Sequence, residues 1–354
     1  MEIKEFLEEI STNHGISGHE SRVTEIVARE FRRYSDELYL DPLGNVIALK
    51  KGKQNHRQNP LRIMLAAHMD EIGLLVSKIE KGGFLRVSPV GGIDPRSLLN
   101  QEVIVHAEQE FPGVIGAKSP HILEPEELEK GVKMEKLYID LGFPEEKVRE
   151  KVSVGDLITI RRDFVSLTND CAAGKALDDR AGVAVVLKCL QELQMLNHEV
   201  DIYAVATVQE EVGVRGAIVS AFGVAPQIGI AIDVTHGDMP GVPEYKTSTL
   251  GKGTVITSGP NIHPFVYDKL VKAASEYHIP YQTDTAPGPT GTDAWALQIT
   301  REGVATGLVS IPLRYMHTSV ELLSMEDIKS SARLLAQFAV SIKSEFIEEL
   351  MGCY

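Results

Sequence analysis

Residues 61–71 read LRIMLAAHMDE, an apolar run that reaches Ala67 and is followed by His68. A short run of this kind, bounded by polar residues, is typical of a parallel strand buried on both faces of a sheet. Four further runs have the same character. They are Val46–Lys50, which precedes no residue of chemical interest, Ile202–Val208 before Glu210 and Glu211, Ile228–Ile232 before Asp233, and Val304–Ser310 ahead of His317.

Helical patterns alternate with these strands. Apolar residues recur at three- and four-residue spacing in Ser21–Arg33, Gly182–Met195, Phe265–Tyr277 and Met325–Leu350, and the N-terminal ten residues also suit an amphipathic helix. The alternation predicts an α/β fold with a mixed, mostly parallel sheet and helices on both faces. In such sheets ligands bind at the carboxyl ends of the strands, where the polar residues named above lie.

The pattern changes between about residues 72 and 166. Short alternating strands are interrupted there by turn signals such as Lys81-Gly82-Gly83 and Val154-Gly155-Asp156. Helical signal is limited to Pro125–Lys130 and Pro144–Lys151. We therefore expect a β-rich domain of residues 72–166, inserted into an α/β domain that residues 1–71 and 167–354 form together.

The composition excludes several classes of partner. The 354 residues carry a formal net charge of −14, whereas proteins that bind nucleic acids or anionic membranes present basic patches. No run approaches the roughly 18 apolar residues of a membrane span, and the N-terminus lacks the features of a signal peptide. The three cysteines have no paired spacing, so they predict neither a disulfide framework nor a thiolate metal site, and a cytoplasmic location fits best.

Two of the candidate sites involve a residue pair. His68 is followed by Asp70, which can accept a hydrogen bond from the imidazole and orient it as a metal ligand. The alternative is a strand-end histidine held for structural reasons. Asp178 and Asp179 come just before a predicted helix, and there the more ordinary role of a carboxylate is to cap the helix.

Three further sites follow later strands. Glu210 and Glu211 are consecutive, and such residues are usually solvated, yet one could bind a metal while the other acts as general base, because adjacent side chains leave a strand in different directions. Asp233 ends an apolar strand, where a carboxylate is costly to desolvate unless paired or coordinated. It could equally reach water or a loop amide. His317 taken alone is an ordinary loop histidine.

These residues would meet at one edge of the sheet, which changes their interpretation as a set. Two histidines with several aspartates and glutamates supply enough nitrogen and oxygen ligands for two divalent ions, with one carboxylate bridging them. A single zinc ion would leave Asp233 or Asp178 without a role. The set therefore favours a dinuclear metal centre.

The sequence resembles the tetrahedral (TET) aminopeptidase family, which includes glutamyl and deblocking aminopeptidases and FrvX-like proteins. The resemblance covers essentially the whole chain. Its motifs are HMDEIG (His68–Gly73), GGIDP (Gly91–Pro95), KALDDRAG (Lys175–Gly182), QEEVGVRGA (Gln209–Ala217), IDVT (Ile232–Thr235), GTDA (Gly291–Ala294) and RYMHT (Arg314–Thr318).

The resemblance assigns the ligands. It implies that His68 and Asp233 bind one ion, that Glu211 and His317 bind the other, and that Asp178 bridges the two. The ions would be zinc or cobalt, with manganese as a further option, since ligand chemistry alone does not separate these metals.

The resemblance also implies a mechanism and an assembly. Glu210 would be the general base, Asp70 would orient His68, and the peptide bond between Asp178 and Asp179 would be cis. The substrates would be peptides with a free N-terminus. The inserted domain would match a PDZ-like dimerisation domain, and twelve subunits, built from dimers, would close a hollow tetrahedral shell.

The chain departs from the family motifs near the expected pocket. Gly288-Pro289-Thr290 precedes GTDA where a glycine-richer approach is expected, and Trp295 follows it in place of a small residue. Other functions left open are a related dinuclear metallo-amidase (a dipeptidase, carboxypeptidase or deacylase), a metal-free glycosidase that uses Glu210, and a shell without catalysis.

Overall fold

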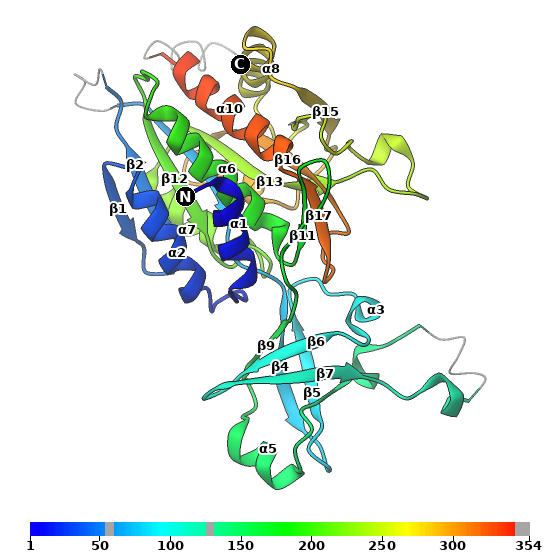
Figure 1. Cartoon of the computed structure of the whole chain (residues 1–354). Helices are drawn as coiled ribbons and strands as arrows, with labels where there is room; N and C mark the ends of the chain where they lie inside the picture. The colour runs from blue at the N-terminus through cyan, green and yellow to red at the C-terminus, as the bar shows by residue number, and fades with distance from the viewer. Residues whose placement is uncertain (54–59, 125–130, 344–354) are drawn as a thin grey trace.

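The computed structural model describes residues 1–53, 60–124 and 131–343. Within these residues the chain forms a large sheet flanked by helices and a separate closed β-barrel (Figure 1). None of the helices in this part of the chain has the length and apolar composition needed to cross a membrane. The predicted helix Pro125–Lys130 lies outside the described residues.

The large sheet contains eleven strands in the described part of the chain, in the order β1-β2-β12-β3-β13-β16-β17-β11-β10, with β14 paired to β16 and β15 paired to β14. Their bounds are β1 Glu37–Leu40, β2 Val46–Lys50, β3 Arg62–His68, β10 Val165–Ser166, β11 Cys171–Gly174, β12 Asp201–Thr207, β13 Ile228–His236, β14 Thr254–Ser258, β15 Tyr281–Thr285, β16 Ala305–Arg314 and β17 Glu321–Ser324. All five predicted strands are present.

The centre of this sheet is parallel and its margins are largely antiparallel. Strands β12, β3, β13 and β16 run parallel, whereas β2 joins β12 antiparallel, and β14 and β17 join β16 antiparallel. The sheet is therefore mixed, as predicted, but only its centre is parallel. The expectation that Val46–Lys50 is a parallel strand is wrong, because this strand, β2, pairs antiparallel with β12. Marginal strands of two to four residues, such as β10, β11 and β17, are too short to show in an apolar pattern.

Helices cover both faces of the sheet, as predicted. One face packs against α1 (Ile3–Thr12), α2 (Ser21–Arg32), α6 (Leu177–Leu193), α8 (Pro264–Glu276) and α10 (Met325–Ser341), and the other against α7 (Arg215–Val224) and α9 (Asp293–Gln298). Alternate residues of β3 serve the two cores: Ile63 and Leu65 belong to the first, Met64 and Ala66 to the second. A single turn of 3₁₀ helix, η3, spans Glu244–Lys246.

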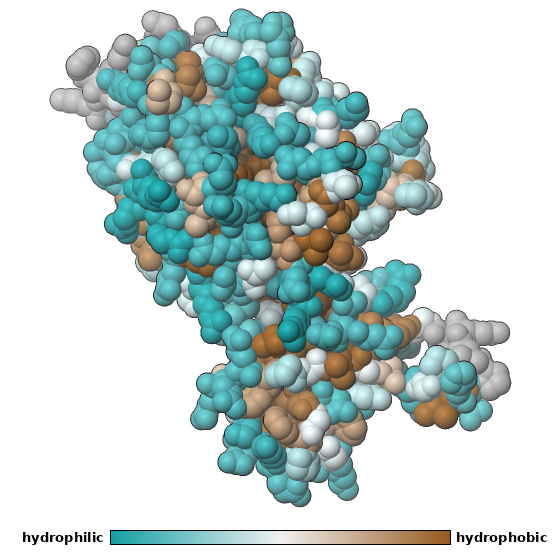
Figure 2. Space-filling view, viewed as in Figure 1, coloured by the Kyte–Doolittle hydropathy of each residue, from teal (hydrophilic) through white to brown (hydrophobic). Residues whose placement is uncertain are grey.

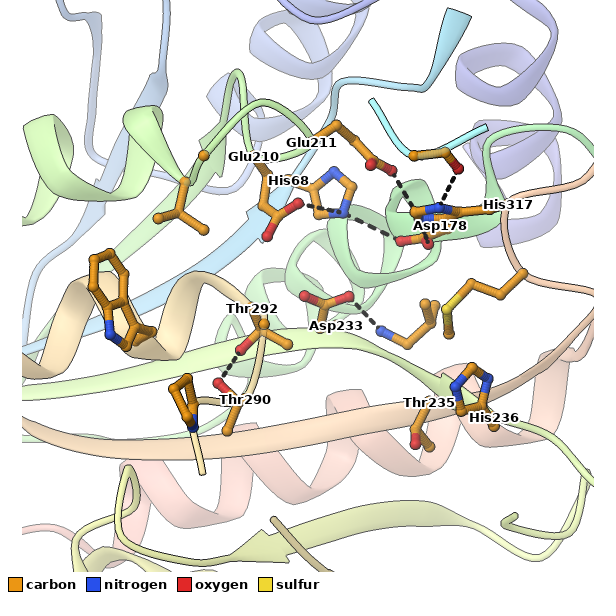
Figure 3. Close-up of a pocket in the computed structure, with 18 residues that line it drawn as sticks. His68, Asp178, Glu210, Glu211, Asp233, Thr235, His236, Thr290, Thr292 and His317 are labelled. Atoms are coloured by element: carbon orange, nitrogen blue, oxygen red, sulfur yellow. Dashed lines mark hydrogen bonds and ion pairs between the residues drawn. The ribbon is translucent and has the colours of Figure 1, made fainter. Parts of the chain in front are cut away.

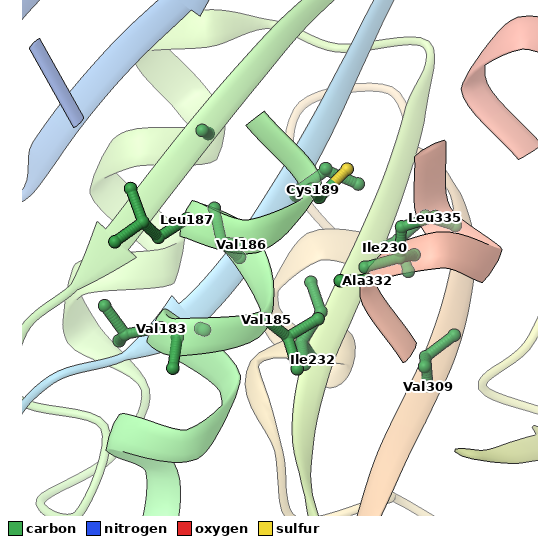
Figure 4. Close-up of a cluster of buried hydrophobic side chains, with 14 of the residues drawn as sticks. Val183, Val185, Val186, Leu187, Cys189, Ile230, Ile232, Val309, Ala332 and Leu335 are labelled. Carbon is green, nitrogen blue, oxygen red and sulfur yellow. The ribbon is translucent and has the colours of Figure 1, made fainter. Parts of the chain in front are cut away.

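Helix α6 lies between the sheet and helices α1 and α10. Figure 4 shows Val185 of α6 beside Ile232 of β13, with Ala332 and Leu335 of α10 nearby. Because α6 is buried on almost every side, it has no clear polar face. It also begins earlier than the predicted Gly182. The predicted Met325–Leu350 ends in the structure at Ser341, and its residues from 344 onward lie outside the described residues.

The barrel has the strand order β4-β5-β8-β7-β6-β9. Its elements are β4 Gly73–Ile79, β5 Leu85–Val90, α3 Pro95–Leu98, β6 Glu102–His106, β7 Glu110–Gly116, η1 Pro120–Ile122, η2 Met134–Lys136, β8 Tyr138–Asp140, α5 Glu145–Lys151 and β9 Leu157–Ile160. It has a hydrophobic core of its own, which includes Val103 and Ile139. Figure 1 shows it set off from the sheet, joined where β3 leads to β4 and where β9 leads to β10.

Candidate metal centre

The ends of the parallel strands bring the candidate residues together. His68 is the last residue of β3 and lies in register with Thr207, the last residue of β12, so that Glu210 and Glu211 follow at the same edge. Asp233 comes from the neighbouring β13, which runs on to His236. Figure 3 shows these side chains directed toward one space.

A first group of ligand atoms forms around His68. Its Nε2 lies 3.2 Å from Oδ1 of Asp178, and Asp233 joins them so that one ligand atom from each residue lies within 4.8 Å of the others. All three side chains are buried. Asp233 accepts a hydrogen bond from the amide of Val234.

A second group forms on the other side of Asp178. Its Oδ2 lies 3.2 Å from Nε2 of His317, and the same nitrogen lies 3.3 Å from Oε1 of Glu211. The two oxygens of one carboxylate thus face two histidines. The residues fall into the two sets that the family resemblance implies, with Asp178 shared between them.

The adjacent glutamates face different histidines. Glu211 lies beside His317, whereas Oε2 of Glu210 lies 3.9 Å from Nε2 of His68. This is the divergence expected of consecutive side chains. Glu210 therefore stands next to the first group of ligands without belonging to either group.

Asp70 lies behind the centre and is completely buried. Its Oδ1 is 3.5 Å from Nδ1 of His68, and its main-chain oxygen is slightly nearer, at 3.3 Å. The carboxylate also accepts hydrogen bonds from the amides of Glu210 and Glu211 and from the hydroxyl of Ser17. Asp70 therefore holds the Glu210–Glu211 segment as well as facing His68.

The two aspartates before helix α6 have different environments. Asp179 accepts a hydrogen bond from the amide of Gly182, which is the capping role weighed as the alternative for this pair. Asp178 instead points toward the two histidines. The peptide bond between them is cis, as the family resemblance implies.

Glu321 is a residue that the sequence does not single out. It is buried at the start of β17, and its two oxygens accept hydrogen bonds from the amides of Asp178 and His317. It thereby links the main chain of two candidate ligands. The only sequence signal for it is its position four residues after His317.

Several residues around the centre adopt a left-handed backbone conformation, which is uncommon for residues other than glycine. Gln209, Val214 and His317 all have positive φ, between 49° and 58°. Such a value is unusual for a β-branched residue such as Val214, and strained backbone of this kind tends to gather at functional sites.

Gly91 and Gly92, the start of the GGIDP motif, contact the centre from the barrel side. A Cβ on Gly92 would meet the ring of His317 at 3.1 Å, and one on Gly91 would meet Glu211 at 3.3 Å. The carbonyl oxygen of Gly92 lies 2.8 Å from Nδ1 of His317. The two glycines therefore allow a main-chain oxygen to orient this imidazole.

The centre gathers negative charge in a buried place. Burial raises the pKa of Glu210 to about 9 and that of Glu321 to about 8. Burial, supported by Asp178, also raises the pKa of Asp233 well above its ordinary value. Asp178 behaves differently, because hydrogen bonds with His317 and His68 outweigh its burial and keep its pKa low.

A cavity of about 680 Å³ opens beside these residues. Its lining includes Glu210 and the five proposed ligand residues but not Asp70 or Asp179, and among the described residues that line it there is no Lys or Arg. Apart from His236, the remaining wall consists of side chains that do not ionise, among them Val214, Thr290, Thr292, Trp295 and Met316. The departures from the family motifs noted in the sequence thus lie in the wall of this cavity.

Comparisons with known proteins agree with this geometry. Residues 44–334 match the family model of M42 glutamyl aminopeptidases. The chain is 38% identical to a lysyl aminopeptidase of Pyrococcus furiosus, over 96% of this chain and 97% of that protein. It is similar to the structure of a TET aminopeptidase from a marine sediment archaeon, Thaumarchaeota archaeon SCGC AB-539-E09, with a TM-score of 0.93, 33% identity and 98% of each chain covered.

A third comparison is with the TET1 peptidase of Pyrococcus horikoshii, which can assemble into a tetrahedron or a large octahedral shell. The TM-score is 0.83 at 31% identity, with 96% of this chain and all of that chain covered. Since the family model spans most of the sequence and these relatives span nearly all of it, the chain belongs to the M42 family of aminopeptidases.

Proposed function

We propose that this aminopeptidase uses two divalent metal ions, held by His68 and Asp233 on one side and by Glu211 and His317 on the other, with Asp178 bridging them. The observation that carries the proposal is the geometry of Asp178, whose two oxygens each lie 3.2 Å from a different histidine nitrogen. A carboxylate that bridges two ions through its two oxygens has this arrangement.

The chemistry of the residues fits such ions. Imidazole nitrogens and carboxylate oxygens are ligands of zinc and cobalt, and carboxylates also suit manganese. Both histidines have a partner for their second nitrogen, Asp70 for His68 and the carbonyl of Gly92 for His317, as metal-binding histidines usually do. Burial, together with neighbouring carboxylates, raises the pKa of Asp233 and Glu210, and divalent cations would offset the cost of holding these groups ionised there.

Glu210 is the general base in this proposal. When bound, a pair of such ions lowers the pKa of water and polarises a carbonyl. Glu210 would take the proton of the attacking water on its carboxylate and return it to the leaving amine. Its position beside the first ligand group, and its absence from both groups, support this role. Asp70 would keep Glu210 in place by accepting a hydrogen bond from the main-chain amide of Glu210.

The cavity wall suggests which peptides are cleaved. A substrate's free α-amine would lie against the carboxylates of the centre. Its first side chain would meet neutral residues such as Val214, Trp295 and Met316, because no Lys or Arg lines the described cavity. We therefore propose a preference for large neutral N-terminal residues over glutamate, because His236 is the one basic side chain in the described lining outside the proposed ligands and a buried carboxylate needs a partner.

We also propose that the chain assembles into a dodecamer built from dimers in the cytoplasm, with the barrel as a PDZ-like dimerisation domain. The barrel exposes apolar side chains, among them Val114 and Val154, and Figure 2 shows apolar surface on it. The assembly of the Pyrococcus horikoshii relative supports the proposal.

The experiment that tests the function is hydrolysis of a panel of aminoacyl p-nitroanilides with N-acetylated counterparts. The purified protein is assayed as prepared, after chelation, and after zinc, cobalt or manganese is added back. We expect release only from free-amine substrates, with leucyl faster than glutamyl substrates, and loss of activity on chelation. Activity on the acetylated substrates would indicate a metallo-amidase, and activity that survives chelation would contradict the two-metal proposal.

A further inference from the structure

A second cluster of histidine and carboxylate side chains lies between the barrel and the large sheet's helices, apart from the catalytic cavity. His14 follows helix α1, His106 is the last residue of β6, and Glu110 is the first residue of β7. One ligand atom from each lies within 4.8 Å of the others. The cluster therefore connects the N-terminal helices to the barrel.

The two histidine rings of this cluster lie against each other, with their centroids 4.0 Å apart and their planes tilted by 35°. Nε2 of His106 lies 2.8 Å from the hydroxyl of Thr159. In the tautomer that carries its proton on Nε2, the hydroxyl accepts a hydrogen bond from Nε2–H and the lone pair of Nδ1 is available to a metal. Nδ1 of His14 is buried without a hydrogen-bond partner, and Nδ1 of His106 faces Oε1 of Glu110 at 3.4 Å. A buried polar atom without a partner calls for an explanation.

The spacing also suits a tetrahedral ion. Nδ1 of His106 lies 3.4 Å from Oε1 of Glu110, and two ligands of a tetrahedral zinc ion with bonds of about 2.0–2.1 Å are separated by roughly 3.3 Å. Arg22 donates to the same oxygen of Glu110 at 2.9 Å, as outer partners of ligating carboxylates often do. Burial lowers the pKa of His14 to about 4 and lowers that of His106, so both rings are neutral near pH 7.

The surroundings also contain positive charge. A cavity of about 270 Å³ at the cluster is lined by Arg22, Arg161, Arg162 and Lys175 as well as the histidines. Lys175 is paired with Glu71 at 2.6 Å. The three arginines weaken the electrostatic attraction between this cluster and a metal ion, so the site should bind zinc less tightly than the catalytic centre does.

We propose that His14, His106 and Glu110 bind an additional zinc ion, with water completing its coordination. The ligands come from both sides of the boundary between the barrel and the large sheet's helices. The ion would therefore fix the orientation of the barrel relative to the catalytic centre without taking part in catalysis. Nothing in this proposal depends on the catalytic ligands.

The test is equilibrium dialysis of the full-length protein at a fixed concentration of free zinc, followed by measurement of zinc per chain. The variants are His14→Gln, His106→Gln and Glu110→Gln, the last at an exposed side chain where folding should be unaffected. The matched control is His121→Gln, an exposed histidine of the barrel outside the cluster.

We expect each cluster variant to bind one zinc ion fewer per chain than the wild type and the control, with hydrolysis of the p-nitroanilide substrates retained. Equal zinc content in all of the folded proteins would overturn the proposal and leave the cluster as packing. A failure of the two-metal aminopeptidase proposal would show instead in activity and its response to chelation, so the two outcomes are separable.

Discussion

Asp70 contacts two parts of the centre, the ring of His68 and the Glu210–Glu211 segment. Its carboxylate faces the ring of His68 and accepts hydrogen bonds from the amides of Glu210 and Glu211. A single completely buried side chain thus connects a proposed metal ligand to the segment that carries the proposed general base. The sequence motif shows the first connection but not the second.

We expect Asp70→Asn to lower kcat/KM by about 10- to 100-fold, as changes in the partners of metal ligands typically do. An amide offers one acceptor oxygen where the carboxylate offers two, so at least one donor loses its partner. Steady-state kinetics at saturating metal measures the effect. Asp268→Asn, at an exposed position of α8, is the control, and equal kcat/KM in both variants would contradict the role of Asp70.

Glu210→Gln should lower kcat by about 10²- to 10⁴-fold, the usual contribution of a positioned general base. Because Glu210 belongs to neither ligand group, the metal content should remain that of the wild type. Kinetics together with metal analysis separates the two effects, and Glu302→Gln, at an exposed residue, is the control. A variant that loses its metal would mean that Glu210 is a ligand.

At the scale of the elements, the two glycines of the GGIDP segment lie close to the centre because they have no side chains. We expect Gly92→Ala to displace the ring of His317, since the new Cβ would lie 3.1 Å from its Nδ1, and to lower activity at limiting metal more than at saturating metal. Titration of the chelated enzyme with zinc measures this difference. Gly131→Ala, where a Cβ would meet no atom within 4 Å, should titrate like the wild type.

Helix α6 carries Asp178 at its start and is buried along its length. Leu187→Ala should therefore cost about 2–5 kcal/mol of the free energy of unfolding, the usual range for a buried leucine. Denaturant unfolding at a fixed chain concentration measures it. Ile218→Ala on α7, where the side chain is 43% exposed, should cost much less, and equal losses would mean that the helix is not packed as described.

How far the sequence predicts the structure depends on the kind of signal each element carries. His68 and Asp233 stand out because each comes at or near the end of a long apolar strand, and the central strands were predictable for the same reason. Asp178 was separable from a capping residue only through the complete ligand set and the family motif, since its neighbour Asp179 does cap the helix. Glu321 acts on main-chain amides, a role that leaves no pattern in the sequence.

At the scale of the whole molecule, the barrel and the sheet have separate hydrophobic cores and meet at the centre itself. Gly91 and Gly92 lie against Glu211 and His317, so the orientation of the barrel affects the shape of the proposed metal site. An assembly that holds the barrel in place would therefore also stabilise the centre. In the proposed assembly, contacts of the barrel with other subunits would therefore affect catalysis as well.

The proposed assembly makes a final prediction. Twelve copies of the 38.8 kDa chain would weigh about 466 kDa, which light scattering can measure. Val154→Asp should shift the protein to smaller species, because the valine is 65% exposed on the barrel and an interface would bury the new charge unpaired. Met195→Asp, at an exposed residue of the large domain, should leave the mass unchanged. If Val154→Asp also keeps the wild-type mass, the surface around Val154 is not the dimer contact, and a smaller mass for the wild-type protein would reject the dodecamer itself.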